Sequence, residues 1–143
     1  MTAQEVFDRA MHLMAESDDS TGATVTADTQ EYRVKSVGIL NVLINEVYPY
    51  SDTFQAEEGK RGVLEPITAL PDDIDMDDFI CGTVLPYGLA AELLKLEDAS
   101  IGNYLYQRYQ ELLRQAMLSI PSSSDSITDV YGMASEYNEF SRW

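Results

Sequence analysis

Hydrophobic side chains recur every three or four residues along several stretches of the chain, which is the spacing of a buried helix face. The first stretch begins after Thr2 and Glu5, whose spacing is that of a capping box at the start of a helix. The hydrophobic positions that follow are Val6, Ala10 and Leu13. The pattern predicts a first helix that ends near Glu16, where a polar loop begins.

The second stretch has the broadest hydrophobic face of the chain. Its hydrophobic positions are Tyr32, Ile39, Leu40, Leu43, Ile44 and Val47. Asp28 and Glu31 repeat the capping-box spacing before it, and Pro49 follows it. Because proline lacks a backbone N–H and cannot continue a helix, we expect the second helix to lie between Asp28 and Pro49.

Aspartates crowd the segment before the third stretch. They are Asp72, Asp73, Asp75, Asp77 and Asp78. Since carboxylates complement the positive end of the helix dipole, we expect the third helix to begin among them. The hydrophobic positions of that helix are Leu85, Leu89, Leu93 and Leu96. Pro86 and Gly88 interrupt this run, which predicts a kink or a restart between Gly82 and Pro86.

A fourth helix is expected to begin near Asp98 or Ser100 and to close at Pro121. The positions assigned to its inner face are Ile101, Leu105, Tyr109, Leu112 and Ala116. Four amphipathic segments of this kind predict a mainly α fold, a helical bundle of about four helices.

Residues 50–72 show no sustained helical spacing. Their centre reads as a turn and consists of Glu57, Glu58, Gly59, Lys60, Arg61 and Gly62. Val63, Leu64 and Ile67 then favour a short strand, which permits a short hairpin. A loop of this length in a compact domain is usually functional or mobile, so we expect it to project from the bundle. The alternative is a meander packed over the helices.

The chain changes character after Pro121. We divide it into a helical bundle domain, residues 1–121, and a serine-rich linker with an aromatic tail, residues 122–143. The tail is too aromatic for an ordinary disordered segment. The residues predicted to dock on a partner are Ile127, Tyr131, Met133, Tyr137, Phe140 and Trp143. The alternative is that this segment folds back on its own bundle.

The charge balance narrows the class of partner. The chain has 143 residues, and 25 acidic side chains against 9 basic ones give a net charge of −16. Binding to DNA through counterion release requires Lys and Arg against phosphates, so tight DNA binding is not expected. The charge fits a solubility feature, a surface for a basic partner, or a wall past which DNA moves without binding.

No hydrophobic run approaches the roughly 20 residues of a membrane-spanning helix. The residues from Met1 to Arg9 lack the basic and then apolar layout of a secretory signal. We therefore expect no membrane association and a location in the cytoplasm.

The aspartate run contains part of the pattern of a calcium-binding loop. Asp73, Asp75 and Asp77 occupy positions 1, 3 and 5 of an EF-hand loop. The loop then requires Gly where Asp78 stands and Glu where Val84 stands. The match fails at its most diagnostic positions, so no metal site is predicted.

The sequence also contains no pattern that is typical of a catalytic site. Cys81 is the only cysteine and His12 the only histidine, which excludes a thiolate zinc site and any pair of histidines. Gly59 and Gly62 lack the spacing of a phosphate-binding loop. We expect no catalytic residues, no cofactor and no enzymatic activity.

The order of these features resembles the head-to-tail connector (neck or adaptor) proteins of tailed bacteriophages, over about residues 28–118. The segments that carry the resemblance are GVLEPITAL at 62–70, the acidic stretch at 71–78, LPYGLAAELL at 85–94 and YLYQRYQELL at 104–113. These segments consist of residues that pack rather than react. In particular, Gly88, Ala90 and Ala91 suggest a face where helices approach closely.

The resemblance implies a structural role in a bacteriophage or prophage virion. Such proteins assemble as a closed ring of about twelve subunits beneath the portal protein. They extend the DNA channel and form the platform for the tail-completion or stopper proteins, and they use no cofactor. DNA passes through the ring without tight binding. The family's long inter-helix loop, which corresponds to residues 50–72, projects toward the channel or a neighbouring subunit.

A second function from a different class stays open at this point. It is a free acidic regulatory protein, of the DNA-mimic or antitoxin kind, that sequesters a basic partner. A connector is expected in the host cytoplasm before assembly and in the neck of the virion afterwards. A connector also forms rings or binds a portal, whereas a sequestering protein acts as a monomer or dimer.

Overall fold

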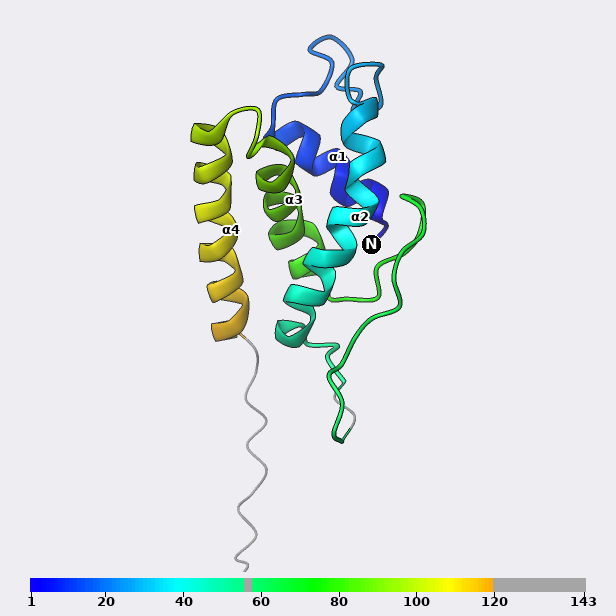
Figure 1. The fold of residues 1–143 in the computed structure, drawn as a ribbon, viewed down its shortest axis with the longest axis vertical. Helices are drawn as coiled ribbons and strands as arrows, with labels where there is room; N and C mark the ends of the chain where they lie inside the picture. Colours follow the sequence, from blue (N-terminus) through cyan, green and yellow to red (C-terminus); the bar gives the residue numbers. More distant parts are fainter. Residues whose placement is uncertain (56–57, 120–143) are drawn as a thin grey trace, which may run out of the picture.

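One short helix lies at the centre of the molecule and contacts the other three (Figure 1). The computed structural model describes residues 1–55 and 58–119. Its α-helices are α1 (Ala3–Leu13), α2 (Gln30–Val47), α3 (Leu85–Leu94) and α4 (Ala99–Ser119). The central helix is α3. The prediction of a mainly α bundle of about four helices is confirmed, and the described residues contain no strand.

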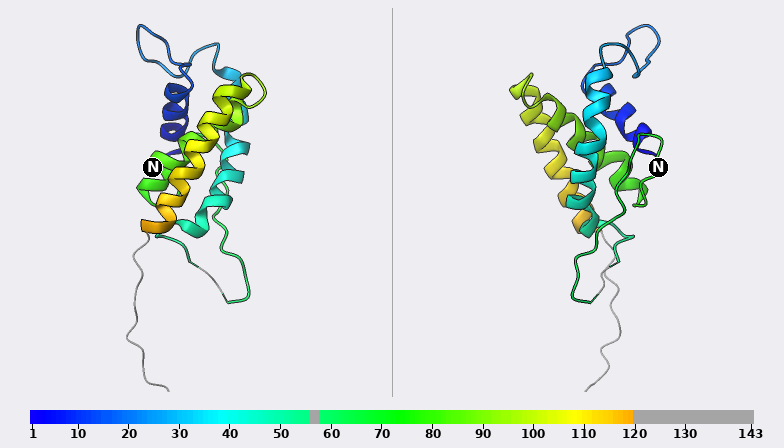
Figure 2. Two further views of the ribbon diagram at one scale, coloured as in Figure 1. Left: turned by 90° about the vertical axis from the view of Figure 1, so that its left-hand side faces the viewer. Right: turned by 45° about the vertical axis from the view of Figure 1, so that its right-hand side comes forward.

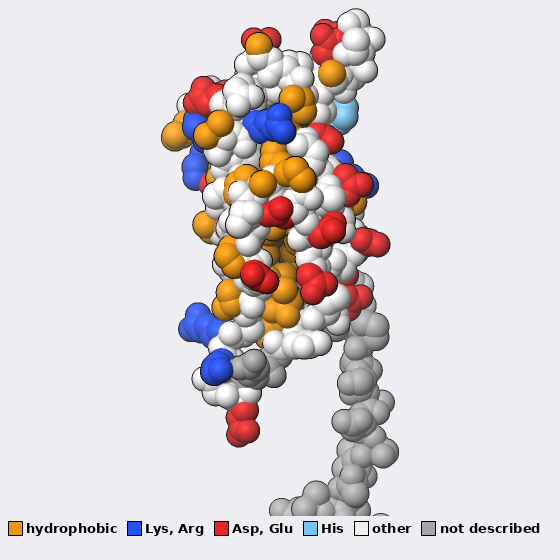
Figure 3. Space-filling model, turned by 90° about the vertical axis from the view of Figure 1, so that its right-hand side faces the viewer, with side chains coloured by type: hydrophobic (Ala, Val, Ile, Leu, Met, Phe, Trp, Pro, Cys, Tyr) orange, Lys and Arg blue, Asp and Glu red, His pale blue; other side chains and the backbone are white. Residues whose placement is uncertain are grey.

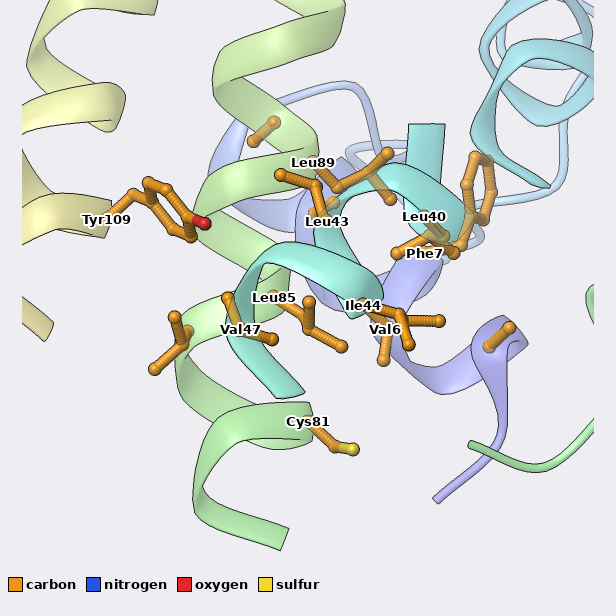
Figure 4. Close-up of a cluster of buried hydrophobic side chains, with 14 of the residues drawn as sticks. Val6, Phe7, Leu40, Leu43, Ile44, Val47, Cys81, Leu85, Leu89 and Tyr109 are labelled. Carbon is orange, nitrogen blue, oxygen red and sulfur yellow. The ribbon is translucent and has the colours of Figure 1, made fainter. Parts of the chain in front are cut away.

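The centre is occupied by α3 because its sequence is apolar on all sides. The buried residues of α3 are Leu85, Pro86, Gly88, Leu89, Ala90, Ala91, Leu93 and Leu94. At Gly88, an added Cβ atom would lie 3.0 Å from ring carbons of Tyr109 in α4. The close helix approach predicted for this segment is therefore confirmed. Leu40, Leu43 and Leu89 belong to the core that α1, α2 and α3 share (Figure 4).

A π-helical turn, η2 (Ile80–Val84), leads into α3. This irregular turn lies where the kink or restart was predicted. The Asp77 carboxylate accepts a hydrogen bond of 2.9 Å from the backbone N–H of Ile80 and caps the helical segment. The helical segment thus begins within the aspartate run, as expected, although not every aspartate of the run takes part. Asp72 is not part of this cap, because its carboxylate binds a separate turn at Thr68 and Ala69.

The first helix starts as predicted and ends earlier. Thr2 and Glu5 form the expected capping box. The helix ends at Leu13 rather than near Glu16, because Ala15 adopts a left-handed conformation with φ 58°. The backbone N–H of Glu16 then bonds to the carbonyl of Met11 at 2.9 Å, as in a Schellman motif.

The second helix has the predicted buried face but a different start. Its first turn follows Thr29, and the capping box expected from Asp28 and Glu31 is absent. The hydroxyl of Thr29 is instead buried in the preceding loop, where it donates to the carbonyl of Thr24 at 2.7 Å. The helix ends at Val47, and a short 3₁₀ turn, η1 (Tyr48–Tyr50), contains Pro49.

In α4, the predicted start is confirmed. The Asp98 carboxylate accepts the backbone N–H groups of Ser100 and Ile101, each at 3.1 Å. The inner face is buried at Leu105, Tyr109, Leu112 and Ala116. The assignment of Ile101 to that face is wrong, because its side chain is 47% exposed. Leu96 is also not a core residue: α3 ends before it, and it is 90% exposed.

Candidate interaction surfaces

The predicted docking residues of the C-terminal tail lie outside the described residues. They are Ile127, Tyr131, Met133, Tyr137, Phe140 and Trp143. Docking of this segment on a partner, and its alternative of packing on the bundle, both stay predictions, as does the division of the chain at residue 121.

The long segment between η1 and η2 has two structurally different parts. Its first part extends beyond the ends of α2 and α4, and its second part returns along α2 (Figure 2). In the second part, Ile67, Leu70 and Ile74 are buried. Residues 50–72 thus combine the predicted projecting loop with the alternative, a meander packed over the helices.

The projecting part is built around two glycines. Gly59 forms the tip with φ 76°. At Gly62, an added Cβ atom would lie 2.5 Å from the ring of Phe54 and 2.7 Å from the carbonyl oxygen of Gln55. The two arms of the loop therefore meet at Gly62, where a side chain has no room. This contact includes no strand pairing, so the expected short strand and hairpin are not formed in the described part of the chain.

The predicted turn residues lie at this tip. Glu58, Gly59, Lys60 and Arg61 are exposed and Gly62 is half-buried, whereas Glu57 lies outside the described residues. Two of the chain's 9 basic residues are therefore neighbours on a loop that extends beyond the ends of α2 and α4.

The returning part of the loop is fixed to α2 by one side chain. The amide of Asn41 donates to the carbonyl of Ile67 and accepts from its N–H, both at 2.9 Å. These two bonds satisfy both backbone polar groups of a buried residue. No pattern in the sequence indicated this pair, because a polar residue on the outer side of a predicted helix usually faces solvent.

The start of α1 holds the same segment from the other side. The backbone N–H of Ala3 bonds to the carbonyl of Asp72 at 2.9 Å, and that of Gln4 to the carbonyl of Leu70 at 2.6 Å. The N–H of Ile74 bonds to the carbonyl of Met1 at 2.9 Å. N–H groups that a helix start leaves unpaired are thus used to position the loop.

A hollow of about 420 Å³ lies between the returning loop and α2. Its hydrophobic lining includes Ile44, Leu64 and Ile67, and carboxylates at Asp73 and Asp75 also line it. Figure 3 shows hydrophobic side chains along this face with acidic side chains beside them. Hydrogen bonds from Thr68 lower the pKa of Asp72 at the same hollow, so this carboxylate is ionised near neutral pH.

A second, smaller hollow of about 170 Å³ lies on the α2 and α3 side of the bundle. It is lined by Ile39, Val42, Leu43, Glu46 and Glu92. Tyr109 approaches this region from α4: its ring passes over Gly88, next to Leu43 (Figure 4). Burial and then the charge of Glu46 raise the pKa of the Tyr109 hydroxyl. The hydroxyl is buried and has no described partner at ordinary hydrogen-bond geometry, but the Glu46 carboxylate acts on its pKa by a hydrogen bond as well as by its charge.

Cys81 packs in the core, and His12 lies on the surface. Burial raises the pKa of the Cys81 thiol to about 12, so it is protonated and unreactive near neutral pH. His12 is exposed on α1. Among the described residues, no three His, Cys, Asp or Glu side chains lie together in a way that would hold a metal ion.

Within residues 1–55 and 58–119, no helix is both long enough and apolar enough to cross a membrane. No protein-family model, no curated protein and no solved structure matches the chain significantly.

Proposed function

We propose that the chain is a head-to-tail connector of a tailed bacteriophage, a ring-forming structural protein that joins the portal to the tail and extends the DNA channel. Three features support the proposal: the resemblance over about residues 28–118, the small helical bundle and the acidic composition. The net charge of −16 suits a channel wall, because a polyanion is repelled by it and moves past.

The observation that carries the proposal is the long loop. It is held at its base by Asn41 and by the start of α1, and it presents Lys60 and Arg61 beyond the ends of the helices. In a ring, one surface of each subunit binds a different surface of the next subunit, and this contact is repeated at every subunit boundary. The exposed guanidinium of Arg61 on this loop can pair with carboxylates on the acidic bundle of a neighbouring subunit.

The test is assembly with the portal protein encoded by the same phage or prophage. Mixing the full chain with that portal should give one large complex of fixed stoichiometry in mass photometry, and a ring below the portal in electron micrographs. The Arg61→Glu variant should associate more weakly than the matched Arg114→Glu variant, which places the same charge change on α4. Absence of any association at micromolar concentration would contradict the connector function.

The charge also supports the second candidate, an acidic protein that sequesters a basic partner. Sedimentation separates the two candidates. A sequestering protein forms a small complex with one or two copies of this chain, and a portal has no effect on its size.

A further inference from the structure

Two helices, α2 and α4, present exposed hydrophobic side chains on the same side of the central helix α3. On α2, Ile39 is half-buried and Val42 is 67% exposed. On α4, Tyr106 and Met117 are 49% and 45% exposed and lie three turns apart on one flank of the helix. We call the surface formed by these four residues the α2–α4 face.

The packing around Gly88 of α3 brings the two flanks to one side of the bundle. The rings of Tyr106 and Tyr109 in α4 have centroids 6.1 Å apart. The Tyr109 ring and Leu43 of α2 both lie within 3.3 Å of the position of an added Cβ atom at Gly88. Leu43 and Val42 line the same hollow of about 170 Å³. The α2–α4 face is therefore a continuous side of the bundle with a hollow in it.

The described part of the chain ends at one end of this face. The helices α2 and α4 run in the same direction, and α3 lies between them (Figure 1). Ser119, the last residue of α4, lines a hollow of about 120 Å³ together with Tyr50, which closes the turn after α2. The chain then continues from residue 120 to residue 143. If it turns back over the face, it runs antiparallel to both helices, as sequential helices in a bundle usually do.

The length of this segment matches the face. The connection at residues 120–126 can span at most about 25 Å, and Val42 lies about 8 Å before the end of α2 at the helical rise. Residues 127–143 cover about 25 Å as a helix, and the 18 residues of α2 cover about 27 Å. The segment is therefore long enough to reach the face and to cover it.

The side chains of the segment also complement the face. Its hydrophobic positions recur every three or four residues and are Ile127, Tyr131, Ala134, Tyr137 and Phe140. Its second half contains Glu136 and Glu139. In the antiparallel direction this half lies near the start of α2 and the end of α3, where Lys35 and Lys95 are exposed. The opposite direction would place the same two glutamates beside Glu46.

We propose that residues 127–143 fold back on the α2–α4 face of their own chain as a further amphipathic helix, antiparallel to α2 and α4. Their hydrophobic side chains cover Val42 and Tyr106. The same chain is the occupant because a connection of this length gives an effective concentration of about millimolar. A second copy is disfavoured because each copy carries a net charge of −16. The contact requires no portal, so it is tested separately from the connector function.

A nitroxide spin label on the full chain, attached at Ser135→Cys, locates the segment by NMR. The amide signals of Ile39 and Tyr106 should broaden strongly, and that of His12 on α1 should not. The wild-type chain is the labelling control, because its Cys81 is buried. A mixture of labelled chain with ¹⁵N-enriched wild-type chain should show no broadening, as expected for a contact within one chain.

Two valines of α2 provide a matched pair of variants in the labelled chain. Val42→Glu places a charge on the α2–α4 face and should abolish the broadening at Tyr106. Val34→Glu makes the same change at a valine that is 72% exposed and lines a hollow on the side of the returning loop. It should leave the broadening unchanged. Both side chains are exposed, so both variants should keep the fold.

Three results would overturn the proposal. Even broadening over all sides of the bundle would show that the segment has no fixed place on it. Broadening that appears only in the mixture would identify a second copy as the occupant. Equal loss of broadening in Val34→Glu and Val42→Glu would show that the α2–α4 face is not the site.

Discussion

The guanidinium of Arg9 in α1 donates a hydrogen bond of 2.6 Å from Nη1 to the carbonyl oxygen of Gly82 in η2. In an α-helix this carbonyl would accept the N–H of residue 86, but Pro86 has none. Arg9 therefore supplies a donor where the π-helical turn and the proline leave one missing. One side chain links the first helix to the irregular entry of the central helix.

Replacing Arg9 with Met should lower the free energy of unfolding by about 1 kcal/mol, the usual contribution of such a hydrogen bond. Urea unfolding of Arg9→Met and Arg114→Met measures the effect, since both changes remove one positive charge. Arg114 is exposed on α4 and makes no hydrogen bond or ion pair with any described residue. Equal stability of the two variants would show that the bond to Gly82 contributes nothing.

Asn41→Ala should release the returning loop from α2. Both backbone groups of Ile67 lose their partners, which should destabilise the fold by about 1–3 kcal/mol. Amide hydrogen exchange at Ile67 should become faster. Asn45→Ala is the control: Asn45 is exposed one turn later on α2, and its replacement should be neutral or slightly stabilising. Unchanged exchange at Ile67 would contradict the assignment.

Two helical glycines should respond to alanine in opposite directions. At Gly88 the added methyl group would press on the Tyr109 ring at 3.0 Å, so Gly88→Ala should destabilise by about 1–3 kcal/mol. At Gly38 an added Cβ meets nothing within 4 Å, and Gly38→Ala should stabilise by about 0.5–1 kcal/mol. Thermal unfolding measures both. A stabilised Gly88→Ala variant would disprove close packing of α3 on α4.

Ala15→Gly should stabilise the chain by about 0.5–1 kcal/mol. Ala15 ends α1 with φ 58°, a conformation that glycine adopts without the steric penalty of a Cβ atom. Ala15→Val should have the opposite effect, because a β-branched side chain is still less favourable there. Denaturant unfolding of the two variants measures the effect. A higher free energy of unfolding for Ala15→Val than for Ala15→Gly would contradict the prediction.

Acid should open the loop after α1 only at very low pH. The Ser20 hydroxyl and the Thr21 amide bond to the Asp18 carboxylate and lower its pKa to about 2. Because the pKa of Asp18 is lowered on folding, its ionised form stabilises the folded state at pH values above the ordinary pKa of 3.8. This contribution is lost as the pH falls through the folded-state pKa of about 2. The Thr21 amide shift should titrate with a midpoint near that value and should not titrate in Asp18→Asn. A midpoint at the ordinary value of 3.8 would contradict these bonds.

Local patterns in the sequence determined most of the helices. The Thr2 and Glu5 capping box, the Asp98 cap and the hydrophobic face of α2 depend on residues within a few positions of one another, so spacing alone predicts them. The same holds for the irregularity before Pro86, because a proline disturbs the turn that precedes it.

Where the local sequence permitted more than one backbone or side-chain arrangement, tertiary contacts determined which of them formed. Ala15 carries no sequence mark of a left-handed cap, and Thr29 has the side chain of a helix cap but uses it in the preceding loop. Ile101 has the helical spacing of a core residue, yet the described residues leave its side chain 47% exposed. These outcomes depend on what the rest of the fold places beside each residue.

The candidate sites depended still more on the three-dimensional structure. The sequence marked the glycine-rich tip of the loop, and the tip does extend beyond the helices. It did not indicate that Asn41 would hold Ile67, or that the Tyr109 ring would pack against Gly88. Such contacts join residues far apart in the chain, and their partners are set by how the helices pack. Periodicity reports which face of a helix is buried, and only packing determines which residue that face meets.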